Sequence, residues 1–256
     1  MWGRKIARGL ILDVLGLFTK PQAGVHILNG HRIALKNPCE EIFHSQLQKS
    51  GQSVRFIRFE EAVELIISKA VVTEPLVTFS FDDGFEECHS MIAPVLEDFN
   101  INAAFFINPN FTSGNREYID YFTNKVVKTP GKLPMSWEQI KDLHNRGHVI
   151  GAHTLDHYNI NDDNIEELEH QIGECRTVIE QHIGSPCDYF AFPFGRLEHA
   201  NSHSIDIAVR HYPYVFSQSD YKNYFSFGGR VINRRHFEPD WPIIHLNYFL
   251  NTEKKY

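Results

Sequence analysis

Residues 76–84 read Leu-Val-Thr-Phe-Ser-Phe-Asp-Asp-Gly, and the rest of the chain is best interpreted outward from this stretch. Its first six residues are mostly β-branched or aromatic, which is typical of a buried strand. The strand ends abruptly at two adjacent carboxylates, Asp82 and Asp83. Two buried like charges side by side are costly unless a cation or a proton intervenes. The pattern therefore indicates either a metal-and-base site or a solvated strand-to-helix turn with an Asp cap.

Other short apolar segments recur along the chain, and helical patterns lie between them. The expected strands are residues 25–28, 54–59, 76–81, 103–107, 148–151, 189–192, 214–217 and 230–237. Three segments have helical patterns. The first covers residues 92–99. The second begins with a Ser136–Gln139 capping box and ends at Gly147, and the third covers residues 163–183 and stops at Gly184. This alternation predicts a parallel α/β sheet, open or closed into a barrel, with functional groups at the carboxyl ends of its strands.

The composition limits the classes of function. The chain has 256 residues with a formal net charge of −7, which argues against binding of nucleic acid or anionic lipid by the whole domain. Four scattered cysteines without a Cys-x-x-Cys pair argue against a disulfide scaffold or a zinc knuckle. The sequence contains no repeat and no long linker, so we expect a single domain over residues 23–256.

Residues 1–22 form a separate expected segment. Ile6, Leu10, Val14 and Leu17 fall at helical spacing, which predicts an amphipathic helix. Such a helix either docks on the domain or makes a peripheral membrane contact through residues 1–20. Asp13 interrupts the apolar stretch and no small-residue cleavage site follows it, so we expect no cleavable signal peptide. The expected location is the cytoplasm or the cytoplasmic face of the membrane.

Two further strand ends carry residues suited to chemistry. His153 and His157 follow the strand at 148–151, and their spacing can place both imidazoles on one side of a helical turn. Pro193, Phe194 and Gly195 follow the strand at 189–192. They form either a plain turn or a site that offers a backbone N–H to an oxyanion and an apolar wall to a sugar ring.

The three strand ends together indicate a functional site more strongly than any one of them does alone. Successive parallel strands bring their carboxyl ends to one rim of the sheet. One carboxylate and two histidines with an open coordination position match a catalytic zinc site or a related divalent metal site. The sequence therefore predicts a metal centre at that rim.

With these motifs the chain resembles the polysaccharide deacetylases of the NodB-homology type, carbohydrate esterase family 4. The family's Phe-Asp-Asp-Gly, His-Ser/Thr-x-x-His and Pro-aromatic-Gly motifs correspond to residues 81–84, 153–157 and 193–195. The resemblance is strongest over the core motifs at 76–200. It implies a distorted (β/α) barrel of about seven strands, related to the TIM barrel.

The resemblance also implies an activity. It is the metal-dependent hydrolysis of N-acetyl groups on an amino-sugar polysaccharide or glycan intermediate, which breaks a non-peptide carbon–nitrogen bond. The metal would be Zn²⁺, with Co²⁺, Ni²⁺ and Mn²⁺ as alternatives. By similarity, the ligands are Asp83, His153 and His157. Asp82 would be the general base, and the backbone N–H of Phe194 would help to hold the oxyanion.

The chain departs from the family pattern in two places. Many members carry an arginine where this chain has Ala191, and Arg230, Arg234 or Arg235 could supply that cation from a late strand. Of these, we expect Arg234 to be a substrate-site residue. The alternative is that these arginines belong to a basic edge strand.

The second departure concerns the family's late Leu-x-His, which supplies a general acid. Here Ile243-Ile-His245 follows Asp240-Trp241 too closely, so His245 and His236 both remain candidate acids. His31, after an early strand, could face the same rim. Two other functions stay open: a catalytically silent glycan-binding relative, and a hydrolase of another non-peptide C–N bond, such as a small cyclic amide.

Overall fold

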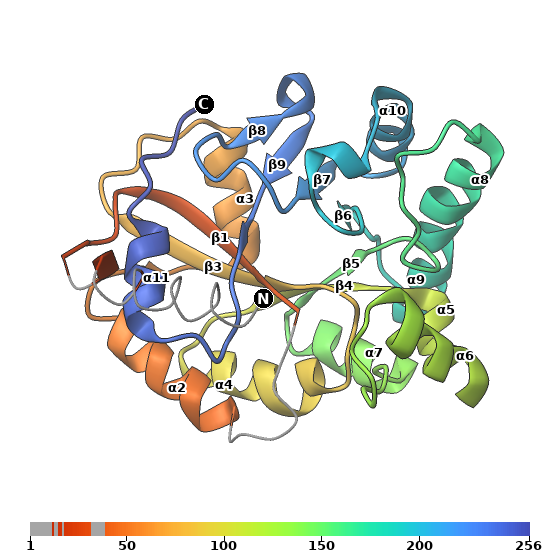
Figure 1. Cartoon of the computed structure of the whole chain (residues 1–256), viewed down its shortest axis with the longest axis horizontal. Coiled ribbons are helices and arrows are strands. Elements are labelled where there is room, and N and C mark those ends of the chain that lie inside the picture. The colour runs from red at the N-terminus through yellow and green to blue at the C-terminus, as the bar shows by residue number, and fades with distance from the viewer. Residues whose placement is uncertain (1–11, 13–14, 17, 32–38) are drawn as a thin grey trace.

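The computed structural model of the chain describes residues 12, 15–16, 18–31 and 39–256. A ten-stranded sheet lies in the middle of the molecule, and helices surround it (Figure 1). The strands are β1 (Gly24–Gly30), β2 (Arg55–Phe56), β3 (Pro75–Phe81), β4 (Ala103–Ile107), β5 (Val149–Ala152), β6 (Tyr189–Ala191), β7 (Tyr214–Ser217), β8 (Phe225–Ser226), β9 (Val231–Asn233) and β10 (Arg235–His236).

The strand order is β10-β1-β3-β4-β5-β6-β7-β9-β8, and β2 pairs with the start of β3. All pairs are parallel except β8 with β9. Only Arg234 separates β9 from β10. Because β9 pairs with β7 and β10 pairs with β1, the segment 231–236 joins both edges of the sheet. The sheet is therefore a distorted barrel with seven strand positions, which confirms the predicted fold class.

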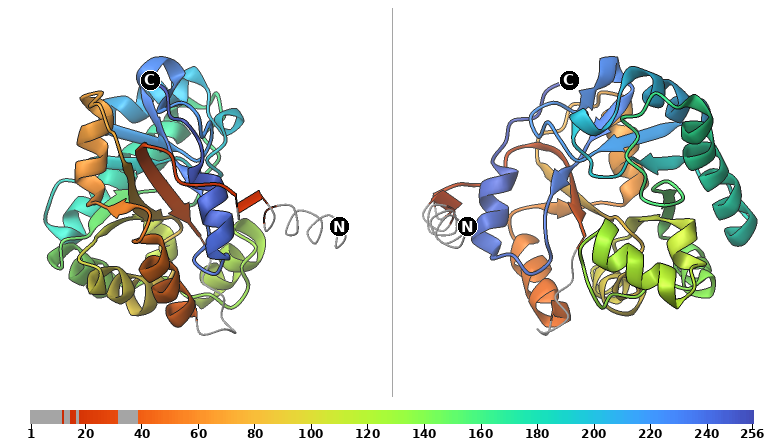
Figure 2. Two further views of the ribbon diagram at one scale, coloured as in Figure 1. Left: turned by 90° about the vertical axis from the view of Figure 1, so that its left-hand side faces the viewer. Right: turned by 45° about the vertical axis from the view of Figure 1, so that its right-hand side comes forward.

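Helices surround the curled sheet: the helix over residues 59–67 packs against the side chains inside the barrel, and most of the others cover its outside (Figure 2). The helices are α2 (Cys39–Ser50), α3 (Phe59–Ile67), α4 (Ala93–Asp98), α5 (Pro109–Thr112), α6 (Arg116–Tyr121), α7 (Trp137–Asn145), α8 (Ile165–Glu169), α9 (Cys175–Ile183), α10 (Ser202–His211) and α11 (Ile243–Leu250). Helix α11 lies beside α2. Its last residue, Leu250, accepts a bond from the backbone N–H of Gln22 just before β1, so the end of the chain lies near the start of that strand.

The core has two parts because successive strand residues point to opposite faces. Ala104 and Phe106 of β4 belong to a cluster inside the barrel, together with Phe59 of α3 and Phe216 of β7. Phe105, between them in the sequence, belongs to the larger cluster beneath the outer helices. On β3 the same alternation places Thr78, Ser80 and the following Asp82 on the inner face.

Most of the expected elements are present, and the largest difference lies at residues 54–59. A strand occupies only Arg55–Phe56 there, and helix α3 begins at Phe59. Two glutamates in its first turn and four buried residues at helical spacing, Phe59, Ala62, Val63 and Ile66, favour the helix. The expected capping box is present, and Gly184 ends α9 in the left-handed conformation.

The stripe expected at the N-terminus, Ile6, Leu10, Val14 and Leu17, lies outside the described residues. Among the helices that the structure describes, none combines the length and the apolar character needed to cross a membrane.

Candidate active site and metal centre

The site begins where β3 ends. Asp82 and Asp83 are both buried, with exposed fractions of 3% and 4%. Asp83 has a φ of 73°, and Gly84 follows with a φ of 71°, so the chain turns sharply after the strand. This turn points the two neighbouring carboxylates in different directions, so each meets a different set of partners.

Asp82 is held by a buried arginine from the segment that closes the barrel. Arg234 Nη1 donates to Asp82 Oδ1 at 2.8 Å, and Nη2 donates to Oδ2 at 2.9 Å. The guanidinium is fully buried and lies over the ring of Phe106, with its central carbon 4.8 Å from the ring centroid. Such a bidentate ion pair fixes both the position and the orientation of the carboxylate.

Asn29 of β1 completes the surroundings of Asp82. Its Nδ2 donates to Asp82 Oδ2 at 2.8 Å, while its Oδ1 accepts from Ser80 and from Arg234. Burial alone would raise the pKa of the Asp82 carboxyl, but the Arg234 guanidinium, with His153 and His31, outweighs it and holds that pKa well below its usual range. Asp82 is therefore ionised at neutral pH.

Asp83, His153 and His157 form a buried cluster that we call the inner group. Asp83 Oδ1 lies 3.7 Å from His153 Nε2 and 3.4 Å from His157 Nε2. Ligands about 2.0–2.1 Å from a tetrahedral metal ion are separated by roughly 3.4 Å. Burial also lowers the pKa of both imidazoles, which leaves them neutral as metal ligation requires. The donor types and their spacing fit a divalent metal ion.

Contacts behind the inner group orient His153. Its Nδ1 donates to the carbonyl oxygen of Ala191 at 2.6 Å, so Nε2 carries the lone pair that faces Asp83. Ligating histidines are commonly oriented by such a bond from the second ring nitrogen. Ala191 thus contributes through its backbone at the position where the family resemblance predicts an arginine.

The loop after His153 is not the helical turn that the His-x₃-His spacing suggested. Thr154 and His157 both have positive φ angles, 62° and 57°, which a right-handed helix does not allow. Thr154 Oγ1 accepts from the backbone N–H of Tyr158 at 2.8 Å, and the buried Asn108 donates to the carbonyl oxygens of His153 and Thr154. These bonds hold an irregular loop that brings both imidazoles to Asp83.

The turn after β6 borders the inner group. Phe194 has a φ of 64° and is 45% exposed, and its ring meets the ring of His157 edge to face at 4.6 Å between centroids. Pro193 and Gly195 on either side of it are buried. A side chain at Gly195 would collide with Gln218, so only glycine fits there. The exposed aromatic ring therefore forms one wall beside the expected metal position.

A cavity of about 890 Å³ opens above this region. Its walls include Asp83, His157 and Phe194, and also the three histidines His31, His236 and His245. Two of the three predicted ligands, the two candidate acids His236 and His245, and His31 thus lie around one space. Most functional small-molecule sites are concave pockets of about this size.

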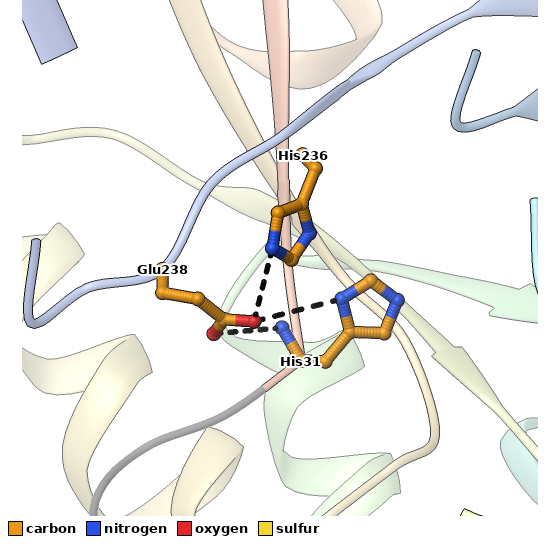
Figure 3. A group of neighbouring side chains, drawn as sticks. All are labelled: His31, His236 and Glu238. Atoms are coloured by element: carbon orange, nitrogen blue, oxygen red, sulfur yellow. Dashed lines mark hydrogen bonds and ion pairs between the residues drawn. The ribbon is translucent and has the colours of Figure 1, made fainter. Parts of the chain in front are cut away.

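His31 and His236 meet Glu238 on the other side of Asp82, and we call these three residues the outer group (Figure 3). His31 Nε2 lies 3.6 Å from Asp82 Oδ2, and its ring lies 5.5 Å from that of His236. Burial lowers the pKa of His31 to about 3, although the carboxylate of Asp82 acts in the opposite direction. Its imidazole is therefore neutral at neutral pH.

The structure also separates the three candidate arginines. Only Arg234 contacts Asp82; Arg230 pairs with Asp206, and Arg235 stacks on the rings of Tyr221 and Phe249. Four site residues carried little or no signal in the sequence analysis: Asn29, Gln218, Glu238 and, apart from its position after a strand, His31. Asn29 had one usable signal, since it is a polar residue inside an apolar strand.

Comparisons with known proteins agree with this fold and these motifs. The family model described as "Polysaccharide deacetylase" matches residues 69–211, more than half of the chain. The YxkH protein of Bacillus subtilis (strain 168), provisionally named a polysaccharide deacetylase, is 21% identical over 138 residues. That match covers 54% of this chain and 43% of the relative, so the chain spans less than half of the relative's length.

Two solved structures share the fold over nearly their whole length. IcaB from Ammonifex degensii is 22% identical with a TM-score of 0.72, covering 90% of this chain and 98% of that one. The Streptococcus pyogenes deacetylase PplD, solved in complex with acetate, is 18% identical with a TM-score of 0.70, covering 90% and 99%. With the family match over residues 69–211, these findings show that the chain belongs to the polysaccharide deacetylase family.

Proposed function

We propose that the protein is a metal-dependent hydrolase that removes acetyl groups from the nitrogen of an amino sugar in a polysaccharide or glycan intermediate. The observation that carries the proposal is the adjacency of the inner group and Asp82. A buried three-residue donor set lies beside an ionised carboxylate that takes no part in it, and two of the three donors, Asp83 and His157, line a cavity large enough for a sugar unit.

The metal that best suits one carboxylate and two imidazoles is Zn²⁺, with Co²⁺, Ni²⁺ and Mn²⁺ as alternatives. We assign Asp83, His153 and His157 as its ligands. When bound, such an ion supplies Lewis acidity, which polarises an amide carbonyl and lowers the pKa of water to about 7.

Asp82 is the proposed general base. It is ionised, and Arg234 and Asn29 hold it from behind, so it can accept the proton of a water that attacks the acetamide carbon. The exposed ring of Phe194 would pack against the sugar, and the backbone N–H of the same residue, in its strained turn, would donate to the developing oxyanion.

The leaving nitrogen needs a proton, because an amide nitrogen leaves poorly without one. Of the three histidines around the cavity, His31 is the one whose imidazole contacts Asp82, with Nε2 3.6 Å from Oδ2. We assign to it the transfer of the proton from Asp82 to the sugar nitrogen, in place of His236 or His245. The products are acetate and a free amine.

Acetate release from N-acetylated oligosaccharides tests the proposal. The zinc-loaded protein should release acetate, and Asp82→Asn should lose this activity while it keeps inner-group metal. His203 is an exposed histidine of helix α10 that belongs to neither the inner nor the outer group, so His203→Ala serves as the matched control. Full activity in Asp82→Asn would refute the proposed base. Metal binding without acetate from any glycan, tested beside small cyclic amides, would favour a binding protein or a different hydrolase.

A further inference from the structure

The outer group brings together two imidazoles and one carboxylate that the reaction above does not use as a set. Glu238 Oε2 accepts a bond from the backbone N–H of His31 at 3.3 Å, which directs Oε1 toward the two rings (Figure 3). Oε1 lies 3.9 Å from His31 Nδ1 and 3.6 Å from His236 Nε2. The three donor atoms all lie within 4.8 Å of one another.

We infer that the outer group, His31, His236 and Glu238, is a second divalent-cation site of zinc type, in which an ion inhibits the reaction. The binding stands on this geometry alone. The inhibition rests on the proposed function, because it follows from the role assigned to His31.

The donor set suits such an ion for the same reason as the inner group, since zinc favours imidazole and carboxylate ligands. The separations of 3.6 and 3.9 Å are somewhat wider than the roughly 3.4 Å between ligands of a tetrahedral ion. The side chains of His31 and His236 are 25% and 36% exposed, which leaves them room to close on an ion. We therefore expect the outer site to bind more weakly than the inner one.

The residues behind the outer group also support ligation. The other ring nitrogen of His31, Nε2, faces the carboxylate of Asp82, so an Nε2–H donated to Asp82 would leave the Nδ1 lone pair toward Glu238. A carboxylate behind a histidine in this manner is the usual support for a metal ligand. Gln218 Nε2 lies 3.1 Å from Nδ1 of His236. If the side-chain amide of Gln218 rotates by half a turn, its oxygen takes this place and can accept a hydrogen bond from Nδ1–H of His236.

An ion at this site would interfere with proton transfer. It would occupy Nδ1 of His31 and keep the proton of Nε2 directed at Asp82, so His31 could no longer accept a proton from that carboxylate. The first equivalent of zinc should therefore activate the protein, and a second equivalent should inhibit it. All three donors border the cavity, so an ion can reach them from solvent.

Metal binding tests the inference directly. Metal-free protein is titrated with Zn²⁺ in competition with a chromophoric chelator, and bound zinc is counted by elemental analysis. We expect two equivalents for the wild type, and a second affinity that falls at least about tenfold in both His236→Ala and Glu238→Gln. His153→Ala should lose the tighter equivalent and keep the weaker one. Circular dichroism and thermal unfolding show that each variant is folded.

The control for adventitious binding in this histidine-rich chain is His203→Ala, which should still bind two equivalents. One equivalent in the wild type up to millimolar zinc would overturn the inference. So would a second equivalent of unchanged affinity in both outer-group variants. If the proposed function is wrong but the second site is real, no acetate is released at one equivalent of zinc, while the zinc titration still gives two equivalents.

Discussion

The inner and outer groups have almost the same composition and border the same cavity, but they differ in how they are held. Each has two imidazoles and one carboxylate. The inner donors are buried and 3.4–3.7 Å apart, whereas the outer imidazoles are partly exposed and stand 3.6–3.9 Å from their carboxylate. The difference shows that burial and support, more than residue type, set the expected strength of each site.

Backbone strain marks the same difference. Asp83, Thr154, His157 and Phe194, in the three motifs of the inner site, all have positive φ angles without being glycines. Such conformations cost of order 1–3 kcal/mol each and persist where the surrounding structure enforces them. No outer-group residue is among the described residues with this strain. The inner group is thus built at a cost in stability, as expected of a functional site.

Metal removal should give the largest effect. A catalytic ion contributes several kcal/mol to the transition state, so we expect chelation to lower acetate release by about 10³-fold. One equivalent of Zn²⁺ should restore the wild type but not His153→Ala. The rate of acetate release at one and at two equivalents is the measurement. If His153→Ala recovered fully, the inner group would not be the activating site.

The two groups also differ in how far the sequence could predict them. The inner donors lie in two short local motifs at the ends of β3 and β5, and parallel strands bring such ends together by rule. The outer donors lie about 200 residues apart, and only the pairing of β10 with β1 makes them neighbours. A single sequence does not show which late segment closes the barrel, so Glu238 had no signal.

Arg234 illustrates the same limit. Three arginines lie near the end of the chain, and the sequence alone left all of them as partners for Asp82. Strand alternation separates Arg234 from Arg235 once the register is known, because Arg234 faces the barrel interior while Arg235 faces outward to aromatic rings. Arg230 lies just before β9 and pairs with Asp206. The fold class was predictable from alternating apolar segments, whereas the strand predicted over residues 54–59 is shorter, at Arg55–Phe56, and its last residue, Phe59, begins helix α3.

Loss of the buried cation beside the inner group should give the next largest effect. Arg234→Met leaves Asp82 buried without its guanidinium, and breaking such a pair costs about 3–5 kcal/mol. Arg230→Met, which removes a more exposed ion pair with Asp206, should cost under about 1 kcal/mol. The free energy of unfolding in urea at pH 7 measures both. Equal losses in the two variants would contradict the assigned importance of burial.

A third imidazole shows what burial does without a carboxylate partner. His26 lies in β1, its Nε2 contacts the carbonyl oxygen of Gln22, and Lys254 and Arg235 add positive charge nearby. Burial lowers its pKa from 6.5 to about 4. The unfolded chain therefore binds a proton that the folded chain does not between these values, so stability falls as the pH drops from 6.5 to 4.

The shift corresponds to about 3 kcal/mol. His26→Gln, which can still donate to Gln22, should lose less stability over this interval by roughly that amount. Urea unfolding at pH 7, 5.5 and 4.5 measures the difference between the two proteins. Parallel curves over the whole interval would show that folding does not lower the pKa of the His26 imidazole.

The smallest effect should come from Glu238→Gln. Without metal, the carboxylate faces two partly exposed imidazoles, so its loss should change the free energy of unfolding by less than about 1 kcal/mol. Added zinc should separate the proteins: at ten times the dissociation constant of the outer site, binding stabilises the wild type by about 1.4 kcal/mol, which is at least about 1 kcal/mol more than in a variant that binds tenfold more weakly. Asp83→Asn should instead lose the larger stabilisation from the inner site. A loss above about 2 kcal/mol in metal-free Glu238→Gln would mean that Glu238 holds the barrel closed at β1 and β10, and that the outer group is a structural ion pair rather than a metal site.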